Sequence, residues 1–198
     1  MPLYLKDNST AMEGDTDLKI LEIMNLRGKS GITGLPFHII VSQTDGILPA
    51  LTNFHYCKRH DYGIGGNLQN YYLELMPEVS LSRTKVRAKL EENPKLARAA
   101  EIQAEMLQLI QFQRWTSDVV CTPKELYEDL KAMGYDWDQL LETKGYWMTL
   151  EDAVEYNHRE LSTYDFLRMR LGLYVPYWMT DEERSKLDLT KAKLKTGT

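Results

Sequence analysis

The pattern of the sequence changes near residue 80, and this change constrains the fold more than any other feature. Before it, short apolar runs alternate with glycine-containing turns, as in Phe37-His38-Ile39-Ile40-Val41 followed by Asp45-Gly46. Apolar runs joined by tight turns predict antiparallel strands. After residue 80, several serine or threonine residues precede an acidic residue by three positions, which is the pattern of a helix capping box. We therefore expect an α+β protein in which strands precede helices.

The same change predicts four segments along the chain. Residues 1–16 are polar and form an N-terminal arm, and residues 17–80 form a small antiparallel β unit of three to four strands. Residues 81–188 form a helical unit, and residues 189–198 form a polar C-terminal tail. The strands are expected at 17–25, 36–42, 47–57 and 71–75, and Pro49 places the third of them at an edge or a bend.

Start and stop signals divide the helical unit into short helices and one long one. Asn93-Pro94 resembles an N-cap followed by proline at the first helical position, and it predicts a helix to about residue 115. Residues at three- and four-residue spacing give this helix an apolar seam. The seam consists of Ala99, Ile102, Met106, Leu109, Ile110 and Gln113. Further helix starts are expected at Thr122, Asp136 or Asp138, Thr149, Ser162 and Thr180.

Composition excludes several classes of protein. The 198 residues carry a formal net charge of −5, which does not provide the basic footprint of a general nucleic-acid-binding protein. The longest apolar runs are a few residues, far below the roughly 20 that a membrane-spanning helix needs. The N-terminus lacks the features of a signal peptide, so we expect a cytoplasmic protein, or a virion component assembled in a cytoplasm. Cys57 and Cys121 are then expected to be free thiols.

The best set of candidate metal ligands is His55, Cys57 and His60, which lie within six residues. Zinc accepts such nitrogen and sulfur donors in tetrahedral geometry. In a strand, however, only His55 and Cys57 share a face, and the spacing is not that of a zinc finger or ribbon. Because no second pair of ligands matches them, we predict no metal site and no cofactor.

The glycine-containing loop at 27–34 fits neither of two catalytic motifs. A phosphate-binding loop ending at Gly28-Lys29-Ser30 would need glycine at the position of Ile23. A nucleophile elbow around the same serine would need glycine at the position of Ile32. Pairs of carboxylates are frequent, but most of them are expected at helix starts, where the helix dipole favours them, or on solvated faces. The sequence therefore contains no coherent catalytic constellation.

Aromatic side chains are concentrated in the helical unit, with nine tyrosine and tryptophan residues between residues 135 and 178. Such residues serve either as core filler or as anchors of a protein–protein interface. As partner-binding residues we single out Trp137, Trp147, Tyr177 and Trp178. Between residues 118 and 165 the chain carries 12 acidic and 4 basic residues, which form either a solvated face or a binding surface for a basic partner.

The leading hypothesis is a non-catalytic structural or interaction subunit of a larger assembly, including an assembly of viral, phage-like type. Its partners would be proteins, bound through the aromatic helical unit and the terminal arms, and the chain would form an oligomer or a hetero-assembly. Neither a membrane nor a nucleic acid is expected as a partner. Two alternatives stay open. One is an acidic inhibitor that occupies a basic groove, and the other is a metal-dependent hydrolase centred on His55, Cys57 and His60.

Overall fold

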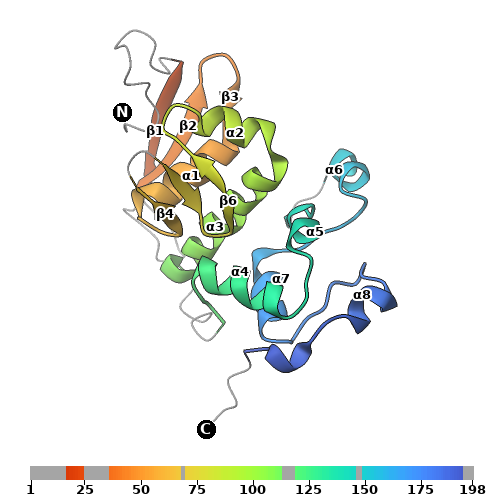
Figure 1. The fold of residues 1–198 in the computed structure, drawn as a ribbon. Coiled ribbons are helices and arrows are strands. Elements are labelled where there is room, and N and C mark those ends of the chain that lie inside the picture. The colour runs from red at the N-terminus through yellow and green to blue at the C-terminus, as the bar shows by residue number, and fades with distance from the viewer. Residues whose placement is uncertain (1–16, 25–35, 68–69, 113–118, 146–148, 194–198) are drawn as a thin grey trace. The chain divides into compact units, whose positions relative to one another are not determined.

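A computed structural model describes residues 17–24, 36–67, 70–112, 119–145 and 149–193. The N-terminal arm at 1–16, the glycine-containing loop at 27–34 and residues 194–198 of the tail lie outside the described residues. The chain divides into two compact units, Met1–Leu107 and Gln108–Thr198. They are coloured red to green and green to blue in Figure 1. Strands lie in the first unit and most helices in the second, so the fold is α+β as expected.

The described residues of unit 1 form two antiparallel sheets of three strands each rather than one sheet of three or four. Sheet A has the order β1 (Leu18–Met24), β2 (Pro36–Ser42), β3 (Gly46–Ile47). Sheet B has the order β4 (Ile64–Gly66), β5 (Tyr71–Leu73), β6 (Met76–Leu81). Ile20 pairs with Ile40 in sheet A, and Gly46 makes the predicted β2–β3 turn with a φ of 78°. The short β4 contains two consecutive glycines, Gly65 and Gly66.

The strand expected at 47–57 is wrong, because Pro49–Arg59 form helix α1. Pro49 lies in the first turn, where its missing N–H removes no helical hydrogen bond. Leu51 and Phe54 are three residues apart, are both buried and share one helical face. The short apolar run was compatible with either element. Packing against β2 favours the helix, because the side-chain hydroxyl of Thr52 in α1 accepts a hydrogen bond from the N–H of Ile40 in β2 at 3.0 Å.

Helix α2 (Val86–Glu92) and helix α3 (Pro94–Phe112) follow sheet B. Asn93 begins α3 as expected, because its side-chain oxygen accepts a hydrogen bond from the N–H of Leu96 at 3.1 Å. Only the first part of the predicted seam is buried, namely Ala99, Ile102 and Met106. Ile110 is 46% exposed, and Gln113 lies outside the described residues.

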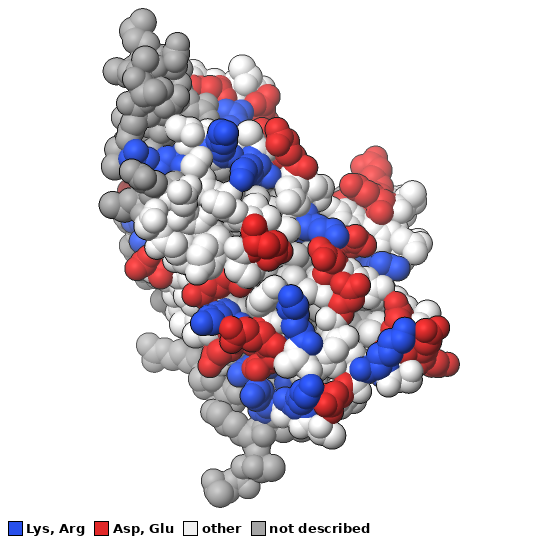
Figure 2. Space-filling view, viewed as in Figure 1, with Lys and Arg blue, Asp and Glu red and all other residues white. Residues whose placement is uncertain are grey.

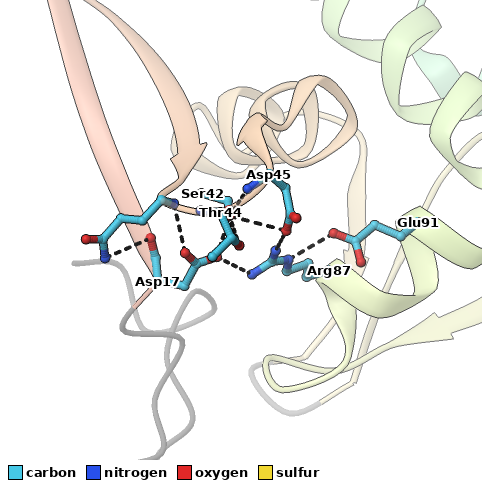
Figure 3. A network of polar contacts seen from close by, with 7 residues as sticks. Asp17, Ser42, Thr44, Asp45, Arg87 and Glu91 are labelled. Atoms are coloured by element: carbon cyan, nitrogen blue, oxygen red, sulfur yellow. Dashed lines mark hydrogen bonds and ion pairs between the residues drawn. The ribbon is translucent and has the colours of Figure 1, made fainter.

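A polar network joins the start of β1, the β2–β3 turn and α2 (Figure 3). The guanidinium of Arg87 donates to Asp17 at 3.1 Å, to Asp45 at 2.7 Å and to Glu91 at 2.9 Å. The hydroxyl of Ser42 donates to Asp17 and, together with the backbone N–H of Gln43, holds the pKa of that carboxyl below its usual value against the opposing effect of burial. One arginine thus ties three segments of unit 1 together.

Unit 2 is built from short helices that begin with side-chain caps. These are α4 (Pro123–Ala132), α5 (Trp137–Leu141), α6 (Leu150–Glu155), α7 (Thr163–Arg170), α8 (Asp181–Ser185) and the 3-10 helix η3 (Leu189–Lys191). Reciprocal capping boxes are present at the four expected positions, which are Thr122, Thr149, Ser162 and Thr180. Asp136 caps α5 through the N–H of Gln139. These local bonds satisfy the first N–H groups of helices too short to be stable alone.

The core of unit 2 lies between α4 and α7. Its fully buried apolar side chains are Leu126, Leu130, Met133, Leu161, Phe166, Leu167 and Met169. Gly134 ends α4 with a φ of 93°, and a Cβ there would lie 3.0 Å from the backbone oxygen of Lys186. None of the helices within the described ranges is both long and apolar enough to cross a bilayer.

Candidate interaction surface

Trp137, one of the four residues selected as partner contacts, belongs to the core of unit 2. It is the first residue of α5 and is 6% exposed. Its ring meets the ring of Tyr127 edge-on at 5.4 Å and the ring of Phe166 at 6.1 Å. The tryptophan therefore connects α4, α5 and α7.

Trp178 is half-buried, and Trp147 lies outside the described residues. The guanidinium of Arg159 lies over the ring of Trp178 at 5.2 Å from its centre. The indole Nε1 of Trp178 is buried and has no hydrogen-bond partner among the described residues. Since a buried indole N–H usually finds a partner, this donor is an exception to normal packing.

Among the three described residues of the selected set, Tyr177 alone lies clearly at the surface, at 62% exposure. Its hydroxyl donates to the backbone carbonyl of His158 at 2.6 Å. Arg184 donates to the backbone carbonyl of Tyr177 at 3.1 Å. The hydroxyl and the backbone of this exposed residue are thereby both held in place, and such fixed side chains lose less entropy when they bind.

The turn that accepts the Tyr177 hydroxyl has an uncommon backbone. Asn157 and His158 are consecutive non-glycine residues with φ values of 51° and 57°. Such left-handed conformations cost free energy and persist only when neighbouring bonds hold them. Here the N–H of His158 donates to the carbonyl of Ala153 at 2.8 Å. The turn, and Tyr177 with it, is therefore fixed to the end of α6.

Helix α6 exposes two branched apolar side chains one turn apart. Leu150 is 89% exposed and Val154 is 80% exposed, whereas only Ala153 of this helix is buried. The capping box of Thr149 and Asp152 closes the start of the helix, and Asp152 anchors it to the preceding segment because its carboxylate lies 3.5 Å from the ammonium of Lys144. We refer to Leu150, Val154 and Tyr177, with the flanking Glu151 and Glu155, as the α6 surface.

The carboxylates that flank this surface are not neutralised locally. Glu151 and Glu155 are exposed, and neither makes a side-chain hydrogen bond or an ion pair with another described residue. Figure 2 shows acidic side chains gathered at α6 beside uncoloured ones, whereas elsewhere on this face of unit 2 acidic and basic side chains are interleaved.

Sequence reasoning missed Leu150 and Val154. Their spacing of four residues, between acidic neighbours, is a signal of a helical stripe. An apolar stripe on a predicted helix normally faces the core, however, and the sequence does not show whether a core is there to receive it. A second exposed apolar set lies on sheet A, on the face opposite α1. It consists of Leu21, Ile23, Phe37 and Ile47.

The residues of the candidate metal set do not come together. Because they lie on helix α1, His55 and Cys57 point in different directions, and His60 is the exposed C-cap, packed edge-on against Tyr56. His55 instead hydrogen-bonds to His38, and burial raises the pKa of the Cys57 thiol to about 12. Within the described part of the chain, no three or more histidine, cysteine or acidic side chains could hold a metal ion.

Comparison of the chain with protein-family models, with curated proteins and with solved structures gave no match.

Proposed function

We propose that the chain is a non-catalytic interaction subunit of a larger assembly and that it binds a protein partner through the α6 surface. The exposure of Leu150 and Val154 on an anchored helix is the observation that supports this proposal most directly. Burying one such side chain stabilises a complex by about 1.5–3 kcal/mol. The viral type of the assembly and its cytoplasmic location are part of the same proposal.

The composition of the α6 surface suggests the chemistry of its partner. Tyr177 offers a large ring with few rotatable bonds, which is typical of residues that dominate binding energy. Glu151 and Glu155 place uncompensated negative charge beside the apolar pair. A shallow apolar pocket bordered by lysine or arginine side chains would complement both features.

The test compares two sets of surface variants. Leu150→Ser combined with Val154→Ser removes the apolar pair, and Leu189→Ser changes an equally apolar side chain, 45% exposed, on η3. Proteins captured from the native source by the unmodified chain are identified and then titrated against all three forms. We expect the double variant to keep its melting temperature and to bind its partner at least about 100-fold more weakly. The Leu189→Ser control should bind normally.

Equal partner binding by the double variant and the unmodified chain would contradict the proposal. Early melting of the double variant would mean that these side chains stabilise the fold instead. In that case Leu150→Ala and Val154→Ala, tested singly, separate packing from binding.

The acidic-inhibitor hypothesis is second, and the unpaired carboxylates Glu151 and Glu155 favour it. The two functions differ in their dependence on salt. Binding dominated by carboxylates should weaken steeply between low and physiological ionic strength, whereas burial of Leu150 and Val154 should be nearly insensitive to it. The variant Glu151→Gln combined with Glu155→Gln should abolish a steep salt dependence if carboxylates dominate.

A further inference from the structure

Three titratable side chains from three elements form one hydrogen-bonded chain in unit 1. The carboxylate of Glu22 in β1 lies 3.1 Å from Nε2 of His38 in β2. Nδ1 of His38 lies 2.9 Å from Nε2 of His55 in α1. The side chains of Glu22 and His38 are 57% and 18% exposed, and His55 is 2% exposed. The chain therefore leads from solvent to the interior, and it joins sheet A to α1.

The two imidazole rings meet end to end. Their planes differ by 13°, and their centres are 5.2 Å apart. Each bonded nitrogen lies about half a ring width from the centre of its own ring. The distance between the two centres therefore equals the 2.9 Å between the nitrogens plus one ring width, which places both nitrogens on the line between the centres. The rings are thus nearly coplanar rather than stacked face to face. An N–H of one ring points at the in-plane lone pair of the other, and only one proton fits between them.

Glu22 determines which nitrogens carry protons when both rings are neutral. A carboxylate only accepts hydrogen bonds, so Nε2 of His38 carries the proton that it donates to Glu22. Nδ1 of a neutral His38 is then the acceptor, and Nε2 of His55 is the donor between the rings. This assignment follows from the hydrogen-bond network.

While its hydrogen bonds are intact, the Glu22–His38–His55 chain can take up one additional proton but not two. A proton added to His38 makes both of its nitrogens donors, and the bond between the rings survives if the proton of His55 moves to Nδ1. The negative charge of Glu22 compensates this state. A second proton, on His55, sets two N–H groups and two positive charges against each other across 2.9 Å. Arg59 and His60, on the same helix as His55, also oppose a positive charge on His55.

We propose that the Glu22–His38–His55 chain is a pH-operated latch, which holds α1 against sheet A until both histidines are protonated and then opens. The other end of this contact does not titrate. There the N–H of Leu48 donates to the carbonyl of Ile40, and the N–H of Ile40 donates to the hydroxyl of Thr52, each at 3.0 Å. Opening would therefore begin at the end of the β1–β2 hairpin that carries Glu22 and His38, and it would leave the rest of the sheet attached.

Amide hydrogen exchange in the full-length chain tests the latch. Protection of the backbone amides of 22–24 and 37–39 is measured between neutral pH and about pH 4, and the exchange rates are corrected for intrinsic exchange. The lower limit is chosen because burial is the main cause that lowers the pKa of His55 to about 4. We expect protection there to fall at least about tenfold, while the amides of α4 and α7 change little. In His55→Gln, which cannot be protonated, this fall should disappear, and His60→Gln should retain it. Constant protection in the unmodified chain, or the same fall in His55→Gln, would overturn the proposal.

A second measurement does not depend on the folding of a variant. Nitrogen-15 NMR of the histidine rings in the unmodified chain reports which nitrogen carries each proton. At neutral pH we expect His38 and His55 both to be protonated at Nε2, and His55 to change tautomer when His38 takes up its proton. A His55 that carries its proton at Nδ1 while His38 is neutral would rule out the latch. Glu22→Gln removes the compensating charge and should move the opening to higher pH.

Discussion

Arg170 in α7 donates from Nε to the carboxylate of Asp129 in α4 at 2.8 Å, and the two side chains are only 14% and 16% exposed. Lys193 approaches the other oxygen of the same carboxylate at 3.6 Å. The pair joins the two helices that form the core of unit 2. Because both groups are largely removed from water, loss of one partner leaves a poorly solvated charge.

We therefore expect Arg170→Met to destabilise unit 2 by about 3 kcal/mol, more than an exposed ion pair would contribute. Denaturant unfolding of this variant, of Asp129→Asn and of the double variant gives the coupling energy. The exposed pair of Lys186 and Glu182, at 2.8 Å, is the matched control, and its loss should destabilise the chain much less. Equal losses at the two sites would mean that burial does not govern these pairs.

Two tryptophans of unit 2 should respond differently to substitution. Trp137→Ala removes a buried ring that touches two others, and it should cost about 3–5 kcal/mol of unfolding free energy. Trp178→Ala removes a half-buried ring whose main described contact is with Arg159, so its cost should be clearly smaller. Chemical denaturation followed by circular dichroism measures both. A smaller loss for Trp137→Ala than for Trp178→Ala would contradict the assignment of Trp137 to the core.

Substitutions along α3 should show a gradient of effects. Met106 is fully buried, Leu109 is half-buried and Ile110 is 46% exposed. Met106→Glu places an unpaired charge in the core and should cost several kcal/mol. Leu109→Glu should cost less, and Ile110→Glu should leave the melting temperature nearly unchanged. A large effect of Ile110→Glu would show that this side chain is covered when the chain is in solution.

The stability of unit 1 should fall as the pH is lowered from about 6.5 towards 4. Burial, with His38, Arg59 and His60, lowers the pKa of His55 from 6.5 to about 4. Between these values the unfolded chain binds a proton that the folded chain excludes, so acid favours unfolding, and neutral pH gives the full stability. The loss should approach about 3 kcal/mol, as a pKa difference of this size implies. Urea unfolding across this pH range measures it, and His55→Gln should remove this contribution.

Neither cysteine should react readily while the chain is folded. Burial raises the pKa of both Cys57 and Cys121 to about 12, and both thiols are free and buried. A thiol-specific reagent at neutral pH should therefore label the native chain slowly and the denatured chain at two sites. Fast labelling of one native thiol would reveal local opening around it. The variants Cys57→Ser and Cys121→Ser would identify which of the two cysteines is labelled.

The α6 surface shows how far the sequence could predict a candidate site. Tyr177 was selected because aromatic residues concentrate in its region, and it is exposed. Trp137 was selected on the same basis and is buried. An aromatic residue offers the same apolar area to a core and to a partner, so composition does not separate the two uses. Exposure depends on which neighbouring elements pack against the side chain, and that is a property of the assembled unit.

The sequence by itself determined the features that depend on bonds between residues three or four positions apart. The capping boxes at Thr122, Thr149, Ser162 and Thr180 formed where they were predicted, because both partners of each bond lie within one turn. Only the tertiary structure decided that 49–59 is a helix and that His38 reaches His55, a residue 17 positions away. A short apolar run fits a strand or a helix equally well until a neighbouring surface selects one of them. Contacts between distant residues have no local signal, because they form only when separate elements pack together.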